Sequence, residues 1–166
     1  MTIGRSTDRI VKSTLLHAPL ARVWAAVSDS QKFGAWFGAE FDGPFVGGTR
    51  LTGRIRPIVD PEVAKLQNPH SGTAFTLLST ASADALAFAF RWHPYAVGDV
   101  DVSNEPMTLV TFGVASTTDG TTLTITESGF DAIPLERRAA AFAANDSGWT
   151  HQLRLVAKYL AMGDHR

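Results

Sequence analysis

Polar and apolar residues alternate through the middle of the chain. Between residues 40 and 128 the side chains change character at about every second position, which is typical of strands with one buried face. The clearest case is DALAFAFRWHP, residues 84–94, in which Phe88, Phe90 and Trp92 share one face. This period predicts several antiparallel strands, and their common apolar face requires a second layer to cover it.

The alternation gives each predicted strand an inward and an outward face. The side chains expected to point inward are Leu51, Ile55, Phe88, Phe90, Trp92, Val110, Phe112, Leu123 and Ile125. On the opposite face of one strand Arg50, Arg54 and Arg56 form a row, which we interpret as the solvated side of the sheet. Asp119 and Gly120 separate the last two strands and are a strong signal for a hairpin turn.

Toward the C-terminus the period becomes helical. Beyond Pro134, apolar residues recur at spacings of three, four and seven, as one face of an amphipathic helix requires. These residues are Leu135, Ala139, Phe142, Trp149, Leu153, Val156 and Leu160. Pro134 suits the first turn, and no later proline interrupts the run. The pattern predicts one long helix over roughly Leu135–Leu160, which would cover the sheet.

Shorter elements precede the alternating region. RIVKSTLLHA, residues 9–18, mixes β-branched and apolar residues and predicts a first strand. APLARVWAAVSD, residues 18–29, and SQKFGAWFG, residues 30–38, predict two short helices, with Ser30 as the expected cap of the second. The segment Pro57–Gly72 is rich in proline, asparagine and glycine and is predicted to be a rim loop or a short helix. The order of elements indicates an α+β fold.

Composition and charge narrow the class of protein. The chain is 45% hydrophobic and 19% charged, which favours a single globular domain over residues 1–166 with its core at about 9–160. A net charge of -1 without a basic excess argues against a nucleic-acid partner. No apolar run reaches the roughly 18 residues of a membrane span, and the first residues lack a signal core, so a cytoplasmic location is expected.

Five segments, in this order, resemble a known family. They are HAPLARVWAAVSDSQKFGAWFG, GGTRLTGRI, FRWHP, TITESGF and NDSGWTHQL. The most specific parts are Pro19 with Trp24, Gly47-Gly48, Gly129-Phe130 and Gly148-Trp149. The chain is similar over nearly its whole length to the activator-of-heat-shock-protein-90-ATPase-like family of the START-like superfamily. That resemblance implies a helix-grip fold: a curved antiparallel sheet of six or seven strands around a long C-terminal helix, with two short helices after the first strand.

The resemblance also implies a cavity between the sheet and the C-terminal helix. Its expected lining, taken from the inward faces, is Trp36, Phe37, Phe88, Phe90, Trp92, Phe112, Glu127, Phe142, Asn145, Trp149 and Leu153. Most of this lining is apolar, as in pockets for small molecules. Glu127 has inward parity and either exchanges a proton inside the pocket or lies at its mouth, solvated or paired with an arginine. Asn145 either orients a ligand or bonds a strand end.

Gly148 stands inside the predicted helix, beside the large Trp149. Glycine in a helix interior is unfavourable by about 0.5–1 kcal/mol relative to alanine, so its presence there needs an explanation. One interpretation is packing: the glycine relieves a clash with a core side chain or lets the helix approach another backbone. The other is that it leaves volume for a guest molecule, with Trp149 as part of the wall. The sequence leaves both open.

The predicted function is binding of a small hydrophobic or aromatic molecule without a cofactor. The five histidines lack metal-ligand spacing, the chain has no cysteine, and neither a nucleophilic serine elbow nor a phosphate loop is present. No metal site or assembled catalytic group is therefore expected. Two alternatives remain: a chaperone-linked interaction module with a chaperone partner, and a cyclase- or hydrolase-type enzyme that uses Glu127 or His93 as acid or base in the same cavity.

Overall fold

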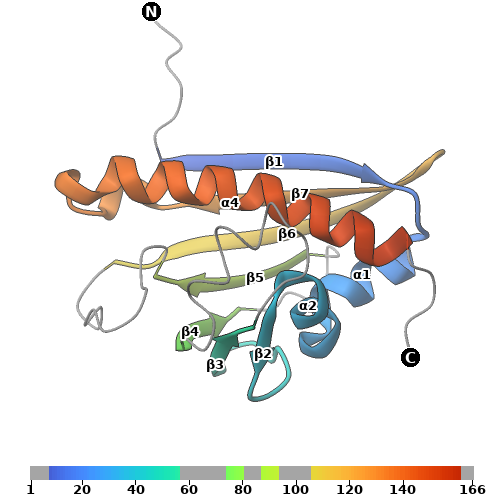
Figure 1. The fold of residues 1–166 in the computed structure, drawn as a ribbon, viewed down its shortest axis with the longest axis horizontal. Coiled ribbons are helices and arrows are strands. Elements are labelled where there is room, and N and C mark those ends of the chain that lie inside the picture. Colours follow the sequence, from blue (N-terminus) through green and yellow to red (C-terminus); the bar gives the residue numbers. More distant parts are fainter. Residues whose placement is uncertain (1–7, 57–73, 81–86, 94–105, 162–166) are drawn as a thin grey trace, which may run out of the picture.

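A computed structural model describes residues 8–56, 74–80, 87–93 and 106–161. Its elements follow the predicted order of one strand, two short helices, a series of strands and a long helix (Figure 1). They are β1 (Arg9–Leu16), α1 (Leu20–Ser28), α2 (Ser30–Phe37), β2 (Ala39–Phe41), β3 (Arg50–Ile55), β4 (Ala74–Ser79), β5 (Ala87–Trp92), β6 (Thr108–Thr117), β7 (Gly120–Ser128), the short 3-10 helix η2 (Phe130–Ala132) and α4 (Leu135–Ala161). The predicted loop at Pro57–Gly72 lies outside the described residues.

The described strands form one antiparallel sheet of seven, in the order β1-β7-β6-β5-β4-β3-β2. Strands next to each other in the chain from β2 to β7 are also neighbours in the sheet, and β1 closes the other side by pairing with β7. The predicted turn at Asp119 and Gly120 is confirmed, because Thr117 pairs with Gly120 across the hairpin. This arrangement confirms the predicted α+β helix-grip fold.

The predicted faces of the strands are confirmed. Phe88, Phe90 and Phe112 are buried, and the three arginines at 50, 54 and 56 are exposed. The rings of Phe90 and Phe112 pack with their centroids 5.7 Å apart, and they belong to one aromatic core beneath the helices. Burial of this apolar face supplies the main driving force that holds the layers together.

The two short helices occupy their predicted positions, but the cap of the second differs. Asp29, and not Ser30, caps α2: its Oδ1 accepts from the backbone N–H of Gln31 at 2.9 Å and of Lys32 at 3.2 Å. Ser30 is already the first helical residue. A cap stands before the first helical residue and accepts from N–H groups two and three positions on, so the aspartate takes this role.

Helix α4 runs without a break through Gly148 and lies along the sheet, as predicted (Figure 1). Its buried residues are Ala141, Trp149, Gln152, Leu155, Val156 and Leu160. The predicted stripe is wrong at its beginning, where Leu135 is 74% exposed and Ala139 is also exposed. Figure 1 shows the reason: the first turns of α4 extend beyond the start of β1, where the sheet no longer covers them.

Candidate functional site

Glu127 lies inside the protein, on the face of β7 that points toward α4. The residue is fully buried, with 0% of its surface exposed. It pairs with Ile10 of β1 and Val110 of β6, so its strand is flanked on both sides within the sheet. Its inward direction, predicted from strand parity, is confirmed. The alternative interpretation, which placed it solvated or arginine-paired at a cavity mouth, is wrong.

Two donors reach the Glu127 carboxylate from neighbouring strands. The indole Nε1 of Trp92, at the end of β5, donates to Oε2 at 2.9 Å. The hydroxyl of Thr108, at the start of β6, donates to the same oxygen at 2.5 Å. Trp92 and Thr108 are direct cross-strand partners, which places both side chains on the same face. Sheet register therefore determines one half of the site.

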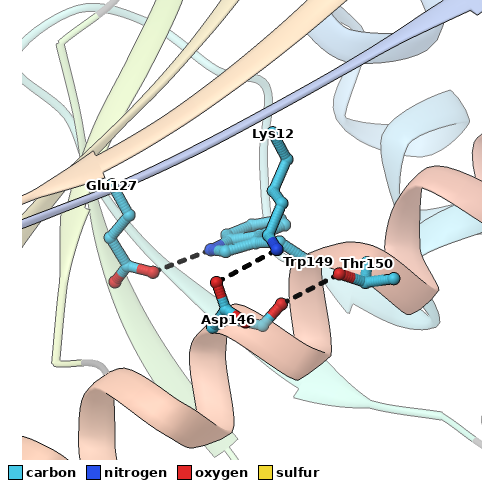
Figure 2. A network of polar contacts seen from close by, with 5 residues as sticks. All are labelled: Lys12, Glu127, Asp146, Trp149 and Thr150. Atoms are coloured by element: carbon cyan, nitrogen blue, oxygen red, sulfur yellow. Dashed lines mark hydrogen bonds and ion pairs between the residues drawn. The ribbon is translucent and has the colours of Figure 1, made fainter. Parts of the chain in front are cut away.

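Two further donors come from α4. Trp149 donates through Nε1 to Oε1 of Glu127 at 2.7 Å (Figure 2). The amide nitrogen of Asn145 is shared between the two carboxylate oxygens, at 2.9 Å from Oε1 and 3.0 Å from Oε2. Because Asn145 and Trp149 are four residues apart, they project from the same helix face. The carboxylate thus joins the covering helix to the sheet.

The donors around Glu127 match an ionised carboxylate. An indole N–H and an amide N–H can only donate, and an ionised carboxylate can only accept. Each oxygen accepts from at least two of these groups. In this arrangement Glu127 has no hydrogen-bonding position left for a substrate, which weighs against its predicted alternative role as a catalytic acid or base. The carboxylate instead orients the groups around it.

Aromatic rings surround this polar cluster. Trp92 stacks on Trp149 with ring centroids 5.7 Å apart and an interplanar angle of 29°. Phe37 lies 6.0 Å from Trp149, and Phe112 meets the same indole edge-on at 5.7 Å. Five of the predicted lining residues, from the four elements α2, β5, β6 and α4, therefore gather around Glu127 and its indole donors. We refer to Trp92, Thr108, Glu127, Asn145 and Trp149 as the carboxylate cluster.

Other predicted lining residues lie elsewhere. Trp36 donates its indole N–H to the carbonyl of Ala26 at 2.8 Å and so serves the contact between α1 and α2. Phe142 packs on Phe130 of η2, with centroids 5.1 Å apart. Phe88 is buried among other phenylalanine rings of the core. Phe90 is also buried, and its ring lies 5.2 Å from that of Trp92, so it adjoins the cluster. Leu153, one turn beyond Trp149, is half-buried.

The surroundings of Gly148 correct the packing interpretation. The residue is half-buried, three positions after Asn145 on the same face of α4. A Cβ built on it would come within 4 Å of no atom in the described part of the chain. Neither a clash nor a close backbone approach among these residues explains the glycine. The second interpretation, space for a guest, remains a prediction.

Sequence reasoning missed three polar residues here. Thr108 shares the parity of Val110 and Phe112, and this signal was sufficient to place it inside. Lys12, on the inward face of β1, forms an ion pair with Asp146 of α4 at 3.0 Å (Figure 2). Nothing in the local pattern predicts that pair, because its two residues are distant in the sequence and meet only when α4 lies along β1.

A separate open hollow of about 640 Å³ lies beside the junction of α1 and α2. It is lined by residues 28–31 and 41–45, including the rings of Phe41 and Phe45. Its two carboxylates are engaged locally: Asp29 caps α2, and Asp42 accepts from the backbone N–H of Thr52 at 3.1 Å. The polar groups therefore stabilise the loops and do not converge on the hollow.

Within the described ranges no group of three or more His, Asp or Glu side chains is placed to hold a metal ion. Among the helices described, none is long and apolar enough to span a membrane. His93 follows β5 and is half-buried, and its Nδ1 has no hydrogen-bond partner among the residues that the structure describes.

Comparison with known proteins agrees with the architecture. The family profile described as Activator of Hsp90 ATPase homolog 1-like protein matches residues 17–161. A comparison with curated proteins gives no match.

Solved structures match over nearly the whole chain. Protein MLL2253 from Mesorhizobium loti has a TM-score of 0.68 at 18% identity, covering 95% of this chain and 99% of its own. A protein from Arthrobacter aurescens, solved by NMR, has a TM-score of 0.71 at 15% identity, covering 99% of this chain and 93% of its own. DynU16, from the dynemicin biosynthetic locus, reaches 0.66 at 23% identity, covering 95% of this chain and 48% of its own, so this chain spans about half of DynU16. These likenesses show a shared fold.

Proposed function

This chain belongs to the Activator of Hsp90 ATPase homolog 1-like family, and we propose that it binds a small apolar or aromatic molecule between the sheet and α4. The proposed site lies beside the carboxylate cluster. Its walls are the half-buried residues Trp92, Asn145 and Leu153, together with Trp149. Folds of this START-like type commonly bind hydrophobic ligands, which is consistent with such a role.

The observation that carries the proposal is the buried Glu127 with its donors. Removing a charge from water is unfavourable, and well-packed apolar side chains of similar volume would often hold a helix on a sheet equally well. Packing of the helix on the sheet therefore does not by itself explain why a carboxylate stands among these indole rings. Pockets for small molecules combine apolar walls with a few precisely placed polar groups, and the cluster has this composition.

The environment of Gly148 supports the same location. On the inward stripe of α4, a Cβ at this glycine would meet no atom of the described residues within 4 Å. Fully buried rings such as Phe90 and Phe112 already pack against each other and offer little room. A guest at Gly148 would lie beside the half-buried Asn145, which precedes it by three positions on the same face of α4.

Binding is tested by titration with N-phenylnaphthylamine, a neutral probe that fluoresces in apolar surroundings. We expect saturable binding by the natural protein and at least a tenfold loss of affinity in Gly148→Leu, whose side chain would occupy the proposed space. Gly148→Ala is the matched control and should bind nearly normally. Circular dichroism establishes that both variants are folded. Full binding by folded Gly148→Leu, or no binding by the natural protein, would contradict the proposal.

Native mass spectrometry of protein purified from its own host provides a second measurement. We expect a co-purifying molecule of low mass that is released on denaturation.

A further inference from the structure

The orientation of the Asn145 amide is determined by Glu127. Its nitrogen lies 2.9 and 3.0 Å from the two carboxylate oxygens. These oxygens also accept from the indole N–H groups of Trp92 and Trp149, which cannot act as acceptors. The Asn145 oxygen cannot replace its nitrogen here without facing the carboxylate oxygens. The amide is therefore held with Oδ1 directed away from Glu127.

This amide oxygen is left as a hydrogen-bond acceptor. Asn145 takes part in the carboxylate cluster only through its nitrogen. Among the described residues none donates a hydrogen bond to its Oδ1. Asn145 is half-buried, and Gly148 lies one turn further along the same face, where a Cβ would meet no atom of the described residues within 4 Å. A guest in that space would be adjacent to an oriented carbonyl oxygen.

On the basis of the proposed function, we propose that Asn145 Oδ1 accepts a hydrogen bond from the ligand. The protein would then select apolar molecules that end in an O–H or N–H donor. A ligand carboxylate would meet an acceptor and lie near the charge of Glu127, with which it is not complementary. Lys12, the cation of the adjacent ion pair, is engaged by Asp146 at 3.0 Å.

Matched ligands test this selection. Naphthol and methoxynaphthalene share one apolar body, but only naphthol carries a donor, and naphthoate carries the anion. In competition with N-phenylnaphthylamine we expect naphthol to bind about 3- to 10-fold more tightly than methoxynaphthalene, the range of one net hydrogen bond. Naphthoate should bind most weakly. Equal affinity for naphthol and methoxynaphthalene, or preference for naphthoate, would overturn the inference while leaving the proposed function intact. If none of the four molecules binds, the proposed function itself fails, and this inference fails with it.

Asn145→Leu removes the acceptor and keeps a similar side-chain shape. We expect the ratio of naphthol to methoxynaphthalene affinity to fall to about one, whatever the change in affinity for methoxynaphthalene itself. Ser147→Ala, an exposed position on the same helix, is the control and should keep the preference. A folded Asn145→Leu protein that still prefers naphthol would refute the role of Asn145. If this variant does not fold, the comparison of ligands on the natural protein still decides.

Glu127→Gln provides an independent readout that a purely structural role would not produce. Its side-chain amide can donate to Asn145, so the Asn145 amide is free to turn and present its nitrogen to the ligand. The ratio of naphthol to methoxynaphthalene affinity should fall toward one or invert. An unchanged ratio in the folded variant would exclude Glu127 as the positioning residue.

Discussion

Glu127 has two roles in this protein: it joins α4 to the sheet, and it orients the Asn145 amide on which the proposed ligand specificity depends. Its carboxylate accepts from two strands and from α4, and two of its donors, Thr108 and Trp149, are themselves buried. Leaving a buried donor without its acceptor costs more free energy than a hydrogen bond contributes on balance to stability, because water cannot replace the lost partner.

We therefore predict that Glu127→Gln lowers the free energy of unfolding by about 1–3 kcal/mol. In either orientation the new amide nitrogen faces an indole N–H that can only donate, so at least one donor loses its acceptor. Denaturant unfolding measures the change. The same substitution at Glu40, an exposed residue of β2 paired with Arg56, is the control and should cost less than about 1 kcal/mol. Equal effects at the two positions would contradict the structural role assigned to the cluster.

Helix α4 both covers the sheet and supplies two donors of the carboxylate cluster. It carries Asn145 and Trp149 into the carboxylate cluster, and it continues unbroken through Gly148. Its stability therefore influences both the fold and the geometry of the proposed site.

We predict that Gly148→Ala raises the free energy of unfolding by about 0.5–1 kcal/mol. Alanine lowers the backbone entropy of the unfolded chain, and its Cβ would meet none of the described atoms within 4 Å. The midpoint of denaturant unfolding should rise without a change in slope. A decrease in stability would mean that Gly148 is required for close packing after all.

The molecule as a whole leads to a prediction about the chaperone alternative. Large hydrophobic residues exposed in the described part of the chain are Val11, Leu15, Val46 and Leu135. All four are aliphatic, so no large aromatic side chain is exposed among the described residues, whereas tryptophan and tyrosine are prominent anchors of protein interfaces. We expect no stimulation of the ATPase of the host's own ninety-kilodalton chaperone at stoichiometric protein. A several-fold increase in ATP hydrolysis would reverse this conclusion and favour an interaction module.

Several features of the fold were predictable because they depend on neighbours in the sequence. Alternation over residues 87–92 was enough to assign the faces of β5, and Asp119-Gly120 was enough to place the hairpin between β6 and β7. The inward direction of Glu127 followed from its parity with Ile125. The errors came where local signals compete: two adjacent residues suited the cap of α2, and the apolar stripe of α4 begins before the helix reaches the sheet.

The sequence by itself determined the elements, their order and the inward faces, because strand and helix periods are local properties of the chain. Only the tertiary structure decided that Trp92, Thr108, Asn145 and Trp149 converge on one carboxylate. This convergence depends on two long-range quantities: the register that places Val110 opposite Glu127, and the position of α4 along the sheet. The strand register and the position of α4 both result from the packing of the complete core. Neither can be read from the sequence period of a single element.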